Sequence, residues 1–252
     1  MAEAKKDDNI LKVAKAQQFK TVDELINRSR PNSIYYTFLV LSSFIIAAGL
    51  LLSNTTIVIG GMLITPVLGP VLVIALVLAV GELKSIKEFA ILTLKSFAIV
   101  ILSSLVLAIL FQAPTQDIFQ FENTIRTAAL YFLIAVSAGI AATFGWARTQ
   151  TAEVLPGIAI AVSLVPPLSL IGIALSSLNF EIARFSFVIF FFNYIGIILG
   201  SIIAFALMKF NKSQREIKKE VKLVEKEAKV KKRRAELKQK KEEQQSAAPP
   251  KS

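Results

Sequence analysis

Long apolar runs separated by short polar gaps make up the middle of the chain, from Ile34 to Met208. Each run is long enough to cross the roughly 30 Å hydrocarbon layer of a membrane as an α-helix. The pattern predicts six crossings, at about residues 34–53, 55–80, 86–111, 127–147, 154–178 and 184–208. We therefore expect an all-α integral membrane protein.

Prolines interrupt the second and the fifth of these runs. The segments Val58–Glu82 and Leu155–Asn179 align without a gap when the chain is shifted by 97 residues. The shift superimposes Pro70 on Pro167 and brings the flanking crossings into correspondence. Each repeat then holds three crossings, an odd number, so the second repeat enters the membrane from the opposite side to the first. The pattern predicts two inverted three-helix repeats with proline-broken second and fifth helices, and chance similarity between apolar helices is the alternative.

Charge is unevenly distributed along the chain. The net charge is +11, yet residues 34–208 carry six Lys or Arg and six Asp or Glu. The excess lies in the tails, with seven cations against five anions in residues 1–33 and sixteen against seven in residues 209–252. Because Lys and Arg beside membrane helices stay in the cytoplasm, we expect both termini there. The predicted location is the cytoplasmic (inner) membrane.

The predicted organisation has six parts. In chain order they are a cytoplasmic N-terminal juxtamembrane segment at 1–33, membrane repeat 1 at 34–111, an extracytoplasmic connector at 112–126, membrane repeat 2 at 127–208, a basic cytoplasmic C-terminal helix at 209–245 and a disordered tail at 246–252. Within the first part, Ile10–Ile26 is expected to form an amphipathic helix that ends before Pro31. Asn54 is expected to cap the second crossing, because Asn is a preferred N-cap residue.

Composition removes several kinds of chemistry. The chain has no Cys and no His, so it offers no thiolate or imidazole metal ligand, no cysteine nucleophile and no histidine proton relay. No Asp or Glu lies deep within a predicted crossing, so proton coupling through a carboxylate is not expected. Lys95 is the one candidate base for a serine nucleophile, and no partner serine is identifiable. We predict neither an enzyme nor a metal or cofactor site.

The two broken helices point to a site near the middle of the membrane. A break frees backbone groups that lipid cannot satisfy, so it persists only where it is packed in protein or lines a wet cavity. A rise of about 1.5 Å per residue places both breaks near the bilayer midplane. The predicted substrate-binding residues are Thr65, Pro66, Gly69, Pro70, Ser163, Pro166, Pro167, Asn193 and Lys95.

Simpler roles stay open for the prolines. Pro70 and Pro167 are each expected at the first position of a half-helix, where the missing N–H costs no hydrogen bond. An inward-facing helix start would suit an anion, and the carbonyls that end the preceding half would suit a cation. The alternative is that the prolines only kink packed helices, with the hydroxyls of Thr65 and Ser163 satisfying the freed carbonyls.

The remaining candidates also have two interpretations. Lys95, within the third crossing, can provide a counter-charge for a substrate or extend its side chain to the headgroups. Asn193, in an aromatic run, can bond to another helix or contact a ligand. Gly60 and Gly157 are predicted structural glycines that let helices approach closely.

The basic segment Lys229–Lys241 lies in the C-terminal tail. Beside a membrane it is expected to bind anionic lipid, each cation contributing on the order of 1 kcal/mol near the surface. Nucleic acid is not expected as a partner, because no base-reading fold or interleaved aromatic residues accompany the charges. The other expected partners are a small solute or ion and further copies of the chain in a homo-oligomer.

Three stretches carry a resemblance to a known family. They are LSNTTIVIGGMLITPVLGP at Leu52–Pro70, LPGIAIAVSLVPPL at Leu155–Leu168 and NYIG at Asn193–Gly196. In these stretches the chain resembles the bacterial and archaeal membrane proteins of domain-of-unknown-function family 389, over about residues 35–208. The resemblance implies a membrane location and this architecture. It implies no substrate, because the family has no established activity.

We therefore expect a multi-pass transporter or channel for a small solute or ion, with its site between the paired broken helices. The alternative is a non-transporting membrane scaffold whose basic cytoplasmic tail binds anionic lipid or a partner protein. A water-accessible cavity at the breaks would favour transport, and a dry, close-packed contact would favour the scaffold.

Overall fold

The computed structural model describes residues 13, 15–81, 83–111, 125–147, 164–210 and 230 of the 252-residue chain. The predicted connector at 112–126, apart from the first two residues of a helix, lies outside this part. So do the basic helix predicted at 209–245, apart from residues 209, 210 and 230, and the tail at 246–252. The described residues contain helices and no strand.

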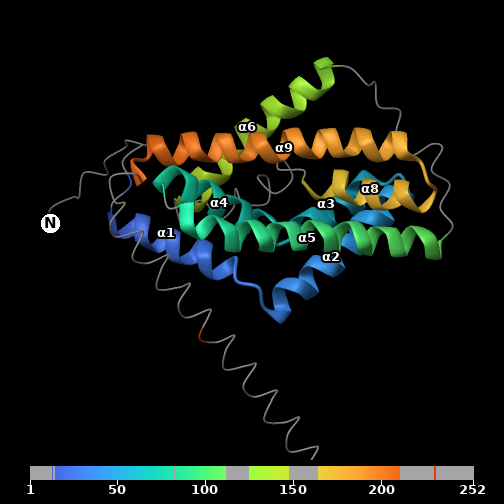
Figure 1. Cartoon of the computed structure of the whole chain (residues 1–252), viewed down its shortest axis with the longest axis horizontal. Helices are drawn as coiled ribbons and strands as arrows, with labels where there is room; N and C mark the ends of the chain where they lie inside the picture. The colour runs from blue at the N-terminus through green and yellow to red at the C-terminus, as the bar shows by residue number, and fades with distance from the viewer. Residues whose placement is uncertain are drawn as a thin grey trace, which may run out of the picture.

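The bounds of the described helices are α1 Lys15–Arg28, α2 Ser33–Leu51, α3 Thr55–Ile64, α4 Leu68–Val80, α5 Leu83–Leu110, α6 Ile125–Ala147, α8 Val165–Ser176 and α9 Phe180–Leu207. Short turns join α1 to α2, α2 to α3 and α8 to α9, whereas residues 112–124 and 148–163 lie outside the described part (Figure 1). The first predicted helix is thus present from Lys15 and ends before Pro31, as expected. A start at Ile10 lies outside the described residues.

Four helices are long and apolar enough to cross a membrane: α2, α5 from Ile86 to Leu110, α6 from Ala129 to Ala147, and α9. The pair α3 and α4 meets the same criteria together, with a 57° bend between the two halves. The described residues are therefore all-helical and membrane-like, with four helices that can cross a membrane, or five when the bent pair counts as one. Of the predicted fifth crossing at 154–178, α8 is described, and the residues before Leu164 lie outside the described part.

Three of these helices have an asparagine as their N-cap residue. The Asn32 side chain accepts a hydrogen bond from the backbone N–H of Tyr35 (2.6 Å), at the start of α2. Asn54 accepts from the first turn of α3, and Asn179 accepts from the Ile182 N–H (3.2 Å) at the start of α9. Each cap satisfies backbone donors that have no partner within the helix. The predicted capping role of Asn54 is confirmed.

Helix α4 lies in the centre of the bundle. All seven residues of Val71–Val77 are buried, and a helix that is apolar on every side belongs inside a membrane bundle. α4 packs against α5, α9 and α1, whereas α8 packs against α5, α9 and α2. The remaining large contacts join α2 to α3 and α5, and α6 to α9.

Glycines set how closely several helices approach. In the contact between α6 and α9, a Cβ added at Gly139 would lie 2.9 Å from the Cα of Ile197, and one at Gly200 would lie 2.9 Å from the Val136 carbonyl carbon. The close contact expected at Gly60 is not seen among the described residues. A Cβ there would meet no described atom of a neighbouring helix within 4 Å. Gly157, its predicted counterpart, lies outside the described residues.

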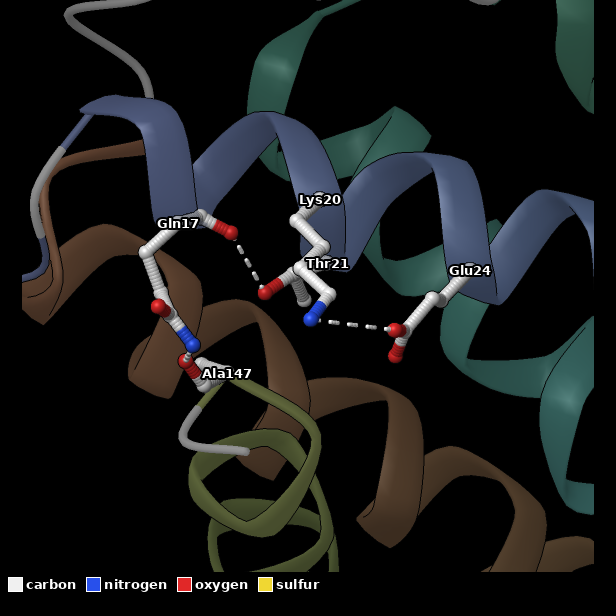
Figure 2. Close-up of polar contacts among 5 residues, drawn as sticks. All are labelled: Gln17, Lys20, Thr21, Glu24 and Ala147. Atoms are coloured by element: carbon white, nitrogen blue, oxygen red, sulfur yellow. Dashed lines mark hydrogen bonds and ion pairs between the residues drawn. The ribbon is translucent and has the colours of Figure 1, made fainter. Parts of the chain in front are cut away.

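Helix α1 closes one end of the bundle. The Gln17 side chain donates a hydrogen bond to the carbonyl oxygen of Ala147, the last residue of α6 (3.3 Å; Figure 2). Gln18 donates to the carbonyl of Met208 just after α9 (3.1 Å). Carbonyls at the end of a helix have no partner within that helix, so α1 supplies hydrogen-bond donors to the ends of α6 and α9. Thr21 and Leu25 lie on the buried face of α1.

Candidate functional site

Three residues separate α3 from α4 at the first break, and the first two of them are not helical. Thr65 is extended, with φ −68° and ψ 132°, and Pro66 follows it. Proline has no N–H to continue the helical hydrogen bonds, and it disfavours helical geometry in the residue before it. The two residues therefore end α3 and produce the bend that was expected here.

The second proline of each motif lies two residues deeper in its helix than we predicted. Pro70 and Pro167 are the third residues of α4 and α8, which begin at Leu68 and Val165. The expected first position is therefore wrong. Proline still costs no helical hydrogen bond at the third position, because the first four N–H groups of a helix have no partner in the helix.

Helix α1 packs against the first break. A Cβ added at Gly69 would lie 2.9 Å from the Ser29 hydroxyl oxygen, so glycine is needed for this approach. The Thr65 hydroxyl is buried and has no hydrogen-bond partner among the described residues. It therefore does not satisfy a freed carbonyl in the way that the simple kink interpretation requires. The Ser163 hydroxyl, its proposed equivalent, lies outside the described part.

A cavity of about 350 Å³ lies beside the start of α8. It is bounded by the α2–α3 turn, one side of α3, the first turn of α8, one face of α9 and Tyr131 of α6. The described residues that line it are Gly49, Leu50, Ser53, Asn54, Thr55, Val58, Met62, Tyr131, Pro166, Pro167, Leu170, Ser186, Ile189 and Asn193.

Exposure falls from one end of this cavity to the other. Ser53, Asn54 and Thr55 are exposed at the α2–α3 turn, whereas Asn193 is only 3% exposed. Asn193 is the fourteenth of the 28 residues of α9, which places it about 20 Å along that helix from Phe180. The cavity thus leads from the surface turn to an amide near the middle of a membrane-crossing helix.

Two polar side chains of α9 line the buried part. Ser186 and Asn193 are seven residues apart and so share one face of the helix. The Ser186 hydroxyl is buried and has no hydrogen-bond partner among the described residues. The helical hydroxyls of Thr93 and Ser96 instead donate to the carbonyl four residues earlier, at 2.8 and 2.9 Å. The buried hydroxyls of Ser104 and Ser169 also have no described partner, but neither residue lines the cavity. A buried hydroxyl without a partner costs free energy that a ligand can recover.

The cavity brings together some of the predicted site residues and not others. Pro166, Pro167 and Asn193 line it, whereas Thr65, Pro66, Gly69 and Pro70 of the first break do not. Lys95 is exposed on α5 and also does not line the cavity.

Ser186 and the wall formed by α3 were not predicted as parts of the site. The signal for Ser186 is its seven-residue spacing from Asn193 on one helix. For the α3 wall, the signal is the polar turn at Ser53 and Asn54, which we interpreted only as a helix start.

The chemistry of the described lining is that of a binding site. No described lining residue carries a charge, and no group of three or more His, Cys, Asp or Glu residues gathers anywhere in the described part. Apolar walls with hydroxyl and amide groups at fixed places can bind and orient a small molecule.

Comparisons with known proteins found an uncharacterised relative and a family of unknown function. The uncharacterised protein MJ0678 of Methanocaldococcus jannaschii is 25% identical over 199 residues, which are 77% of this chain and 59% of that protein. The chain thus spans about three fifths of the length of this curated relative. No solved structure matches it. The family described as Domain of unknown function (DUF389) matches residues 62–199, more than half of the chain. The chain therefore belongs to this family of unknown function.

Proposed function

We propose that the protein is a six-crossing transporter or channel that moves a small solute or ion through the cavity beside α8. The observation that carries the proposal is the cavity, which leads from the exposed α2–α3 turn to the buried Asn193. Ligand pockets are mostly apolar concavities of roughly 300–1,000 Å³ with a few fixed polar groups. Sites near the midplane beside interrupted helices are typical of secondary transporters.

Recurring helix boundaries support two related halves. α4 begins at Leu68 and α8 begins 97 residues later at Val165. α5 and α9 are each 28 residues long and are separated by the same 97 residues. After α4, Gly81 has a φ of +75°, and its equivalent Leu178 after α8 has a φ of +55°. Leucine rarely adopts the left-handed backbone conformation, so its presence at the same place after α8 is a specific similarity between the two halves.

The arrangement of these helices supports an inverted relation between the halves. In Figure 1, α5 runs from left to right along the long axis and α9 runs from right to left. α4 packs against both α5 and α9, and α8 packs against both α9 and α5. These contacts are preserved when the two halves exchange roles, as a two-fold axis in the membrane plane requires.

The orientation follows from the charge pattern. With both basic tails in the cytoplasm, the α2–α3 turn and the mouth of the cavity face the outside of the cytoplasmic membrane. Helix α1 then covers the cytoplasmic ends of α6 and α9, where Gln17 and Gln18 bond to their last carbonyls. Solute entering from the outside reaches Asn193, and its release to the cytoplasm requires movement around α1 and α4.

Access to Asn193 from both sides of the membrane tests transport without knowledge of the solute. The chain has no cysteine, so Asn193→Cys provides a single reactive thiol in the full-length protein. We expect a membrane-impermeant thiol reagent to label it in right-side-out vesicles and in inverted vesicles. A channel or an alternating-access carrier exposes a central site to both sides, whereas a scaffold does not.

Two further single-cysteine variants serve as controls. Thr55→Cys, at the exposed mouth, should be labelled only in right-side-out vesicles. Ser169→Cys, which is buried on α8 and does not line the cavity, should stay unlabelled in both preparations. Labelling of Asn193→Cys from a single side, with the controls behaving as stated, would contradict transport.

A further inference from the structure

We propose, resting on the transport function above, that the cavity binds an uncharged solute with an apolar body and a hydroxyl or amide group at its buried end. This assigns a chemical class to the substrate. It follows from what lines the cavity, from the state of the two helix starts beside it, and from the placement of its polar groups.

A charged solute would find no counter-charge on the described walls. The described lining residues are apolar, hydroxyl-bearing, amide or proline residues. Lys95, the predicted candidate for a counter-charge, is exposed on α5 and does not line the cavity. Moving an ion from water into an apolar site without a paired charge is far more costly than moving a neutral molecule of the same size.

The two helix starts beside the cavity also offer little to an anion. At α3, the Asn54 side-chain oxygen already accepts the N–H groups of Thr56 (3.1 Å) and Ile57 (3.3 Å). At α8, the second and third residues are Pro166 and Pro167, which have no N–H. A helix start binds anions through free N–H groups, and most of these are occupied or missing here.

The polar groups are placed to orient a neutral ligand. Ser186 is 1% exposed and its hydroxyl has no partner among the described residues, while Asn193 lies seven residues further along the same face of α9. Apolar side chains of α3, α8 and α9 line the same space, including Val58, Leu170 and Ile189. A ligand can place an apolar body against these walls and exchange hydrogen bonds with the two α9 side chains.

Three probes of nearly equal shape test the assignment. Benzyl alcohol is neutral, benzoate is an anion and benzylammonium is a cation at neutral pH. Each radiolabelled probe is equilibrated by dialysis with the purified full chain in detergent, and binding to protein-free micelles is subtracted. We expect benzyl alcohol to bind and both ions to bind at least tenfold more weakly.

Matched variants locate the binding. Ser186→Ala and Asn193→Leu should each weaken benzyl alcohol binding about three- to tenfold, the effect of losing one hydrogen bond. Ser169→Ala removes another buried hydroxyl without a described partner, but one outside the cavity, and should leave the affinity unchanged. Because Ser186→Ala removes a single oxygen, it remains informative if Asn193→Leu does not fold.

The outcomes separate this inference from the proposed function. Equal or tighter binding of benzoate or benzylammonium, weakened by Ser186→Ala, would overturn the substrate class and leave the cavity as a binding site. The substrate class would also be overturned if none of the probes bound above the micelle control. The same holds if the affinity for benzyl alcohol were unchanged in both Ser186→Ala and Asn193→Leu. Transport itself is judged independently by the two-sided labelling of Asn193→Cys.

Discussion

Gly139 and Gly60 show how the role of a single glycine depends on its surroundings. A Cβ at Gly139 would lie 2.9 Å from the Ile197 Cα, and the Gly139 carbonyl also accepts a hydrogen bond from Ser201 of α9 (3.1 Å). Gly60 lies within α3, and a Cβ there would meet no described atom within 4 Å. The two positions are therefore expected to respond in opposite directions to the same substitution.

We predict that Gly139→Ala destabilises the protein and that Gly60→Ala does not. The first change forces α6 and α9 apart, at a cost of about 1–3 kcal/mol. The second reduces the freedom of the unfolded chain and stabilises by about 0.4–1 kcal/mol. Thermal unfolding midpoints of the two variants in detergent measure the difference. A midpoint for Gly139→Ala at or above that of Gly60→Ala would contradict the packing described for α6 and α9.

Local chemistry decided which residue roles were predictable. Asn54 was predicted as a helix cap because the preference of Asn for that position depends only on neighbouring backbone groups. The role of Ser186 was not predictable, because a serine in a membrane helix commonly bonds within its own helix. Only the packed structure shows that this hydroxyl has no described partner and lines a cavity. The role of Gly60 stays a prediction, because its expected partner Gly157 lies outside the described residues.

At the scale of elements, the attachment of α1 to the end of α9 can be tested by a single substitution. Gln18 is 4% exposed, and its side chain donates to the Met208 carbonyl at the end of α9 (3.1 Å). Replacing Gln18 with Ala leaves that buried carbonyl without this donor, at a cost of about 1–3 kcal/mol. We expect the amides of α1 to exchange with deuterium roughly tenfold faster or more in Gln18→Ala, since α1 would open without global unfolding.

A surface variant of the same helix is the control. The Lys20 Nζ lies 4.0 Å from the Glu24 Oε1, and the Lys20 side chain is 62% exposed. Exposed ion pairs contribute little to stability, so Lys20→Ala should leave the exchange rates of α1 nearly unchanged. Equal rates in both variants would show that the contact between Gln18 and α9 does not hold α1 in place.

Proline and apolar patterning predicted the break between α3 and α4 and the proline-rich start of α8, but not the helices that pack against them. The bend after Ile64 and the start of α8 follow from backbone rules that act over a few residues. The packing of Ser29 against Gly69 depends on how α1 folds back across the bundle. The sequence pattern therefore predicted two equivalent breaks, whereas in the described structure the cavity lies beside the start of α8 and α1 packs against α4 at the first break.

At the scale of the whole molecule, two related halves surround one cavity in our proposal. The 97-residue shift was visible in the sequence because proline and glycine spacing repeats along with the apolar runs. The position of the cavity was not, because the walls come from α2, α3, α6, α8 and α9, which meet only in the folded bundle. An apolar side chain indicates that a residue lies in the membrane or the protein interior. It does not indicate which helix the residue packs against, because lipid and protein interiors are similarly apolar.

The orientation of the two halves is the central claim, and Lys87 and Arg184 provide its most direct test. They are 97 residues apart, each is the fifth residue of its helix, α5 or α9, and both are exposed. Lys87→Cys and Arg184→Cys are labelled separately with a membrane-impermeant maleimide in right-side-out and inverted vesicles. Inverted halves predict that Arg184→Cys reacts in right-side-out vesicles and Lys87→Cys in inverted ones. Reaction of both thiols from the same side would contradict the account.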